Sequence, residues 1–140
     1  KIAAIGVSNV GLDSLKRAAS FAPIVSVQNR CSIFCKRDFH NGVIDYCAAA
    51  AINYIAHSPL GGYRSYTRTG ENEIINRIAN EHVTSPYQVA LAWLLGEAPQ
   101  LIVIPGARRM ISVEDSHAAG GLTLKDSERA VLAQIPDSAI

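Results

Sequence analysis

The chain has 140 residues, of which 49% are hydrophobic and 18% are charged, and its formal net charge is +1. This composition predicts one globular domain with its own core over residues 1–140. The scattered basic residues argue against nucleic-acid binding, since a polyanion requires a concentrated basic face. No apolar run approaches the roughly 20 residues of a membrane helix, so no membrane partner is expected. Three cysteines without regular spacing, and no signal-peptide layout, favour the cytoplasm.

In chain order, the sequence repeats a strand followed by a helix. Short apolar runs rich in β-branched residues predict the strands, and apolar residues at helical spacing predict the helices. Between the third strand and the next helix, residues 57–70 form a glycine-rich polar loop that we interpret as functional. The predicted elements are strands 2–7, 24–27, 52–56 and 101–104, and helices 11–20, 38–51, 71–81, 86–95, 113–119 and 124–134.

The helix at 86–95 has the clearest start signal in the sequence. Ser85 is a predicted N-cap, Pro86 suits the first helical position, and Gln88 is the expected capping-box partner. The following residues, 89–95, are apolar almost all round, so this helix is expected to be buried. Trp93 within it is expected to lie in the core rather than at a ligand.

Polar or charged residues stand at the end of each predicted strand. In a barrel of parallel strands, the carboxyl ends of the strands form the active face. Side chains at these ends are therefore expected to lie close together and to bind a ligand. The pairs are Ser8 with Asn9, Gln28 with Asn29, His57 with Ser58, and Gly106 with its two following arginines.

The last strand runs into a glycine, two arginines and a predicted helix. Gly106 allows close backbone approach, while Arg108 and Arg109 supply positive charge. Ser112 is the expected N-cap of helix 113–119, with Asp115 in its first turn. This combination suits a phosphate group. The alternative is an ordinary loop with two solvated arginines.

Two folds could accommodate four such units, a doubly wound sheet or part of an eight-fold barrel. Dinucleotide binding by a doubly wound sheet requires G-x-G-x-x-G after the first strand, and only Gly11 is found there. The missing motif favours part of an eight-fold barrel over a doubly wound sheet. Cys31, Cys35, His40 and Cys47 could be considered as a metal set, but their irregular spacing leads us to expect no metal.

Five motifs in order carry a resemblance to a known family. They are GVSN at 6–9, VQN at 27–29, HSPLGG at 57–62, SPYQVALAWLL at 85–95 and IPGARR at 104–109. With these motifs the chain resembles the aldo-keto reductase family over essentially its whole length. The resemblance implies an α/β fold, half of a (β/α)8 TIM barrel made of four parallel βα units, namely the C-terminal half with strands five to eight. The chain begins at Lys1, directly before a strand, and is expected to be a fragment of a longer protein.

The resemblance also implies an NADP(H) cofactor and the reduction of carbonyls of aldehydes or ketones to alcohols. Ser8, Asn9 and Gln28 match positions that hold the nicotinamide carboxamide, and His57 matches an aromatic residue that stacks on the ring. Ser58, Leu60 and Gly62 match the loop around the pyrophosphate. The adenosine phosphate would be held by the segment 106–116, in which the candidate residues are Gly106, Arg108, Arg109, Ser112, Asp115 and Ser116.

The chain departs from the family pattern at two places. Gly106 and Ser112 stand where many members have Lys and Arg, and Ser116 stands where many have Asn, so Arg108 or Arg109 is expected to compensate. The family's catalytic Tyr, His, Lys and Asp lie on the first half of the barrel, and none of the six Asp here has a Tyr five residues later. No catalytic residue is therefore assigned to this chain.

The expected partners follow from the same resemblance. They are a small-molecule carbonyl substrate and either the missing N-terminal half-barrel or a second copy of the chain. The alternative function is a non-catalytic nicotinamide-nucleotide-binding or interaction module.

Overall fold

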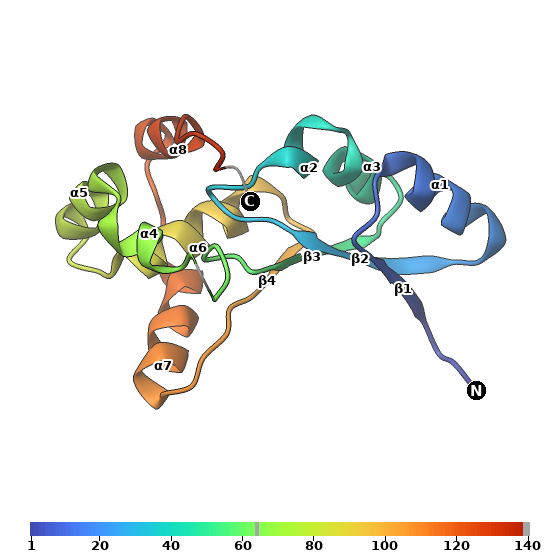
Figure 1. Cartoon of the computed structure of the whole chain (residues 1–140), viewed down its shortest axis with the longest axis horizontal. Helices are drawn as coiled ribbons and strands as arrows, with labels where there is room; N and C mark the ends of the chain where they lie inside the picture. The colour runs from blue at the N-terminus through green and yellow to red at the C-terminus, as the bar shows by residue number, and fades with distance from the viewer. Residues whose placement is uncertain (64, 139–140) are drawn as a thin grey trace.

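The computed structural model describes residues 1–63 and 65–138. Strands and helices alternate through most of the chain (Figure 1). The elements are β1 (Ile5–Ser8), α1 (Leu12–Phe21), β2 (Ile24–Arg30), α2 (Arg37–His40), α3 (Val43–Ala49), β3 (Asn53–His57), α4 (Thr67–Glu71), α5 (Glu73–Glu81), α6 (Pro86–Glu97), β4 (Leu101–Ile104), α7 (Met110–Ala118), the 3-10 helix η1 (Ala119–Gly121) and α8 (Asp126–Ala133).

The strands of the described chain form one four-stranded parallel sheet in the order β1-β2-β3-β4. The four predicted parallel strands are thus confirmed. Because crossovers between parallel strands share one hand, strands laid down in sequence order place their helices on the same face. In Figure 1, α1, α2 and α3 lie above the sheet, and α6 lies at the left, where it contacts β4. The sheet therefore lacks the reversal of strand order that a doubly wound fold requires.

The core lies between the sheet and these helices. Val27, Tyr54 and Ala56 point to the helix side and are fully buried. The helix α6 is buried along Val89–Leu94, because it is apolar on all sides and packs between β4 and neighbouring helices. Trp93 lies in this core as predicted, with its ring edge-on to Phe39 at 5.9 Å between centroids.

Two strands differ in length from the prediction. The first begins at Ile5 rather than Ile2, since β2 begins at Ile24 and offers no partner to the residues before Ile5. The second extends to Arg30, because Gln28, Asn29 and Arg30 pair with β3 despite their polar side chains. Gln28 and Asn29 are thus within a strand, where adjacent side chains point to opposite faces.

The predicted helix 38–51 is two helices. It is interrupted at Asn41 and Gly42, where Gly42 adopts a left-handed backbone with φ of +82°. A helix cannot continue through that conformation. Because α3 then ends at Ala49, Ala50 and Ala51 lie outside the helix and are exposed.

The C-terminal segment returns to the loop between β2 and α2. The Lys36 ammonium is almost fully buried and donates to the carbonyls of Ile33 at 2.8 Å and Ile135 at 2.5 Å. It also pairs with Asp137 at 2.8 Å, whose other carboxylate oxygen accepts the Lys36 amide. We call these contacts of Lys36 with residues 135–137 the C-terminal clasp.

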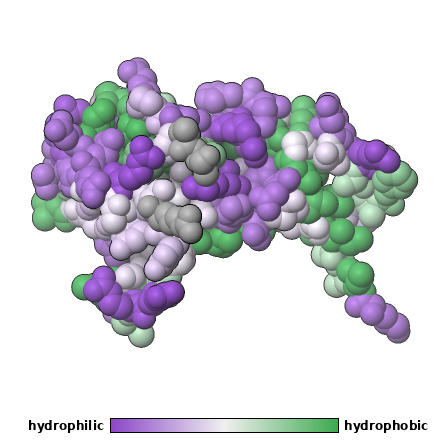
Figure 2. All heavy atoms as spheres, viewed as in Figure 1, coloured by the Kyte–Doolittle hydropathy of each residue, from purple (hydrophilic) through white to green (hydrophobic). Residues whose placement is uncertain are grey.

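The side of the sheet away from the helices is open and partly apolar. Ile102 and Ile104 of β4 are 45% and 44% exposed there. Figure 2 shows hydrophobic surface along β1 and the residues before it. Among the described residues, no helix has the length and apolar character needed to cross a membrane.

Candidate functional site

Strand register brings the predicted site residues to the open face of the sheet. Ser8 pairs with Gln28, and Arg30 pairs with His57. Because side chains alternate along a strand, Ser8, Gln28, Arg30 and His57 share the face opposite to that of buried Val27. Ser8, Gln28 and His57, predicted from three separate motifs, are therefore brought together. Arg30 was not predicted, although its position two residues after Gln28 placed it on the same face.

The turn after β1 is fixed to β2. Asn9 has a left-handed backbone with φ of +54°, which Asn tolerates better than most residues. Its amide N–H donates to the carbonyl of Gln28 at 3.0 Å, and the Ser8 hydroxyl donates to the same carbonyl at 2.9 Å. The Asn9 side chain is left exposed beside the ends of β2 and β3.

His57 connects this turn to the loop after β3. Its Nε2 lies 3.2 Å from the Asn9 side-chain oxygen, and its Nδ1 lies 3.1 Å from the Ser58 hydroxyl. An amide oxygen only accepts, so Nε2 carries the hydrogen and Nδ1 accepts from Ser58. Burial, and then the positive charge of Arg30, lower the pKa of His57 below its usual value. The ring is therefore neutral at physiological pH.

The loop after β3 is held to the sheet by Arg30. Its Nη2 donates to the carbonyl of Gly61 at 2.9 Å, while its buried Nε has no partner among the described residues. Gly61 has φ of +94°, and a Cβ there would come within 3.0 Å of the Ser65 carbonyl, so the tight turn requires glycine. The predicted pyrophosphate loop is thus an ordered turn, in which Leu60 packs against the core.

Gly106, Arg108 and Arg109 lie exposed between β4 and α7. Neither arginine forms an ion pair with a described residue. Gly106 has open space around its Cα, so nothing in the described fold requires a glycine there. Both arginine side chains are therefore exposed to solvent and without an acidic partner among the described residues.

The prediction that Ser112 caps helix 113–119 is wrong. The helix α7 begins at Met110 with Arg109 as its N-cap, and the Arg109 carbonyl accepts the amides of Ser112 at 3.0 Å and Val113 at 3.3 Å. Ser112 is consequently in the first turn of the helix and partly buried. Ser116, one turn later, is partly buried as well.

Asp115 holds α7 against α6. Its carboxylate accepts the Ser85 hydroxyl at 2.8 Å and the Gln88 side-chain amide at 2.7 Å. Gln88 thus makes this contact instead of completing the expected capping box, while Ser85 caps α6 by accepting the Gln88 amide N–H at 3.0 Å, as predicted. Because no residue of α7 is buried in the described structure, this polar contact is a principal link between the two helices.

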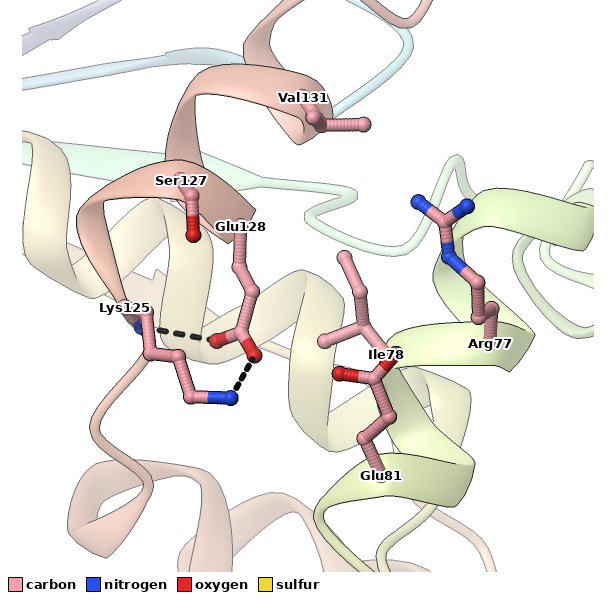
Figure 3. Close-up of a pocket in the computed structure, with 7 residues that line it drawn as sticks. All are labelled: Arg77, Ile78, Glu81, Lys125, Ser127, Glu128 and Val131. Carbon is pink, nitrogen blue, oxygen red and sulfur yellow. Dashed lines mark hydrogen bonds and ion pairs between the residues drawn. The ribbon is translucent and has the colours of Figure 1, made fainter.

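The hollow shown in Figure 3 lies elsewhere, between α5 and α8. It has a volume of about 300 Å³, and the charged residues that line it are Arg77, Glu81, Lys125 and Glu128. Glu128 accepts the Lys125 amide at 2.8 Å and pairs with His82 at 3.0 Å. Burial opposes the charge of Glu128, but these hydrogen bonds outweigh it and lower its pKa. This hollow is therefore part of the packing of α8.

Cys31 and Cys47 are buried, and Cys35 is partly buried. Burial raises the pKa of Cys31 to about 12 and that of Cys47 to about 11, so neither is a reactive thiolate. Among the described residues, no group of three or more His, Cys, Asp or Glu side chains is arranged to hold a metal ion.

Comparisons with known proteins agree with this geometry. The profile of the Aldo/keto reductase family matches residues 1–137. Pyridoxine 4-dehydrogenase of Escherichia coli is 33% identical over 128 residues, which cover 91% of this chain and 43% of that protein. The chain thus spans about half the length of the relatives it matches.

Solved structures give the same result. The thermostable aldo-keto reductase Tm1743, solved with the inhibitor epalrestat, is 29% identical with a TM-score of 0.81, over 93% of this chain and 47% of that one. A mutant of Gox0644 solved in complex with NADPH is 26% identical with a TM-score of 0.77, over 95% and 46% of the two chains. The chain belongs to the aldo/keto reductase family of oxidoreductases.

Proposed function

We propose that this chain is the cofactor-binding portion of an NADP(H)-dependent oxidoreductase that reduces carbonyls of aldehydes or ketones to alcohols. The observation that carries the proposal is the convergence of Ser8, Asn9, Gln28 and His57 at the carboxyl edge of one open sheet face. The relative solved with NADPH supports the choice of cofactor.

The residues present fit a nicotinamide. A carboxamide needs both donors and acceptors, and the side-chain amide of Gln28 has no hydrogen-bond partner among the described residues. The neutral ring of His57 provides a flat surface, held in place by Asn9 and Ser58. When bound, the cofactor supplies the hydride for the reduction.

In this proposal, Arg108 and Arg109 bind the phosphate end of the cofactor. Both are exposed and free of ion pairs with described residues, so they can approach a 2′-phosphate. The amides of Met110 and Ile111 at the start of α7 follow immediately and add donors. Leu60 and Gly62 would contact the cofactor through their backbone atoms, and Ser116 would contact it from α7. Since Asp115 already binds α6, we propose that it positions this segment.

We further propose that residues 1–140 form the C-terminal half of a (β/α)8 barrel. The sequential strand order with helices on one face supports this, and so do the two unpaired edges at β1 and β4. The exposed isoleucines of the open face would then line the barrel interior. The missing half, or a second copy of the chain, would close the ring, and the catalytic residues would come from the missing half.

Free cysteines at positions 31, 35 and 47 support the cytoplasm as the compartment of the protein.

Three measurements test the proposal. NADPH fluorescence should show saturable binding to the purified chain, with NADH bound more weakly. Sedimentation should show self-association, because exposed strand edges and apolar surface favour pairing. The chain alone should not consume NADPH with a generic aldehyde, whereas the longer protein should.

Different outcomes would overturn different parts. Absence of NADPH binding would overturn the assignment of the cofactor. A monomeric chain that reduces aldehydes would overturn the half-barrel. Binding without turnover in the longer protein would favour a nucleotide-binding module instead of an enzyme.

A further inference from the structure

The turn that carries Ser8 and Asn9 is also held from the opposite face of the sheet. Asn29 of β2 points to the helix side and is fully buried. Its side-chain oxygen accepts the Val10 amide at 3.0 Å, and its side-chain nitrogen donates to the Val10 carbonyl at 2.8 Å. Asn29 therefore pairs with Val10 in the way that a neighbouring strand would.

Asn29 is in turn oriented by Asp38 of α2, above the sheet in Figure 1. The second hydrogen of the Asn29 amide nitrogen donates to Asp38 Oδ2 at 2.6 Å. The Tyr54 hydroxyl donates to the same oxygen at 2.9 Å. With both amide hydrogens and the amide oxygen engaged, Asn29 has one orientation.

The other carboxylate oxygen of Asp38 is equally occupied. Arg37 Nε donates to Oδ1 at 2.9 Å and the Asn41 side chain donates to it at 3.0 Å. Asp38 is almost fully buried, and burial alone would raise its pKa. The four hydrogen bonds outweigh burial and lower it, so the carboxylate is charged and accepts from all four donors.

We propose that Asp38 and Asn29 are positioning residues that set the Ser8–Asn9 turn and, through it, the nicotinamide end of the site. The inference rests on the proposed function only in its last step. Asn9 is clamped from two sides, because its own amide bonds to Gln28 and the next residue bonds to Asn29. A shift of the turn would move the Asn9 side chain away from His57, which lies 3.2 Å away.

Backbone hydrogen exchange tests the positioning step without any cofactor. In Asn29→Ala, the amides of Val10 and Asn9 should exchange at least roughly tenfold faster. The Val10 amide loses its acceptor, and the Asn9 amide lies in a turn that is no longer fixed by Asn29. The Tyr54 amide, bonded to the Gln100 carbonyl at 3.0 Å at the other end of the strands, should change less than about twofold. Equal acceleration at all three amides, or none at Val10, would overturn the proposal.

Asn41→Ala is the matched control, because Asn41 donates to the same carboxylate but does not reach Val10. It should leave exchange at Val10 unchanged. If Asn29→Ala does not fold, Asp38→Asn takes its place, since it keeps the shape of the side chain and removes the charge that orients Asn29. Faster exchange at Val10 than at Tyr54 is expected there too, and its absence would contradict the role of Asp38.

The second step is tested with two ligands. Asn29→Ala should weaken NADPH binding roughly tenfold, as expected for losing one or two hydrogen bonds to the carboxamide. Binding of 2′-phospho-ADP-ribose, which lacks nicotinamide, should change less than about twofold. Equal losses for both ligands would indicate a general structural role and overturn the proposal. If the unmodified chain binds neither ligand, the proposed function fails, while the exchange result still decides whether Asp38 and Asn29 hold the turn.

Discussion

Replacing Gln28 by Ala separates a binding role from a structural one. The Gln28 side chain is partly buried and makes no hydrogen bond to a described residue, so its replacement by Ala removes only the partial burial of one methylene group, Cγ, together with the carboxamide. At about 0.8 kcal/mol per fully buried methylene, the loss of stability is about 1 kcal/mol at most. For a chain of 140 residues, this corresponds to a decrease in Tm of roughly 3 °C.

The expected effect on cofactor binding is larger. A side-chain amide that donates to and accepts from the carboxamide contributes two neutral hydrogen bonds of about 0.5–1.5 kcal/mol each. Gln28→Ala should therefore raise the Kd for NADPH by roughly 5- to 150-fold. Fluorescence titration and thermal melting of the same samples measure both quantities.

Gln100→Ala is the matched control for this substitution. Gln100 is also partly buried, but it lies before β4 at the other end of the strands and donates to the Ile44 carbonyl at 3.2 Å. It should lower Tm by a few degrees and leave the Kd unchanged. If Gln28→Ala instead lowers Tm severely, or leaves NADPH binding intact, then the assignment of Gln28 to the cofactor is wrong.

Three further predictions follow from other parts of the structure. Replacing Arg108 and Arg109 together by Ala should weaken NADPH roughly tenfold but NADH little, and equal losses in titration would refute a 2′-phosphate contact. Trp93→Ala should lower the free energy of unfolding by about 3–5 kcal/mol, because it empties a buried site. Trp93→Phe should lower it by only about 1–2 kcal/mol, because the buried indole N–H has no partner among the described residues and its loss breaks no hydrogen bond. Denaturant melts measure both values. The pKa values of Asp38 and Glu128 are lowered in the folded state, so they stabilise the chain above their unfolded pKa values near 4, and this contribution is lost as the pH falls through the folded values. Melting curves between pH 7 and about pH 2 should therefore show a decline that Asp38→Asn makes shallower.

The sequence predicted the strands well because buried parallel strands require continuous apolar residues. The end of β2 was missed because Gln28, Asn29 and Arg30 are polar, and only pairing with β3 extends the strand that far. The start of α7 was missed for a related reason. The carbonyl of Arg109 closes the first turn with backbone hydrogen bonds, so no side-chain cap at Ser112 is needed.

The sequence located the site at one edge of the sheet, but it did not show which face of the sheet each side chain occupies. Gln28 and Asn29 were expected to act as a pair, yet adjacent residues of a strand point to opposite sides. Gln28 lies on the open face, and Asn29 lies among the helices beside Asp38. The roles of Asp38 and Tyr54 depend on contacts between separate elements, for which no local pattern in the sequence exists.

The C-terminal clasp has a consequence for the order of folding. Lys36 and Asp137 lie 101 positions apart, so their contacts close a loop that spans most of the chain. Closing such a loop costs more conformational entropy than pairing neighbouring strands, and the clasp should therefore form after the sheet. A chain shortened by its last six residues would still assemble its strands, but the Lys36 ammonium would be left in the core without Ile135 or Asp137. Such a truncation should mainly accelerate unfolding and leave the rate of folding almost unchanged.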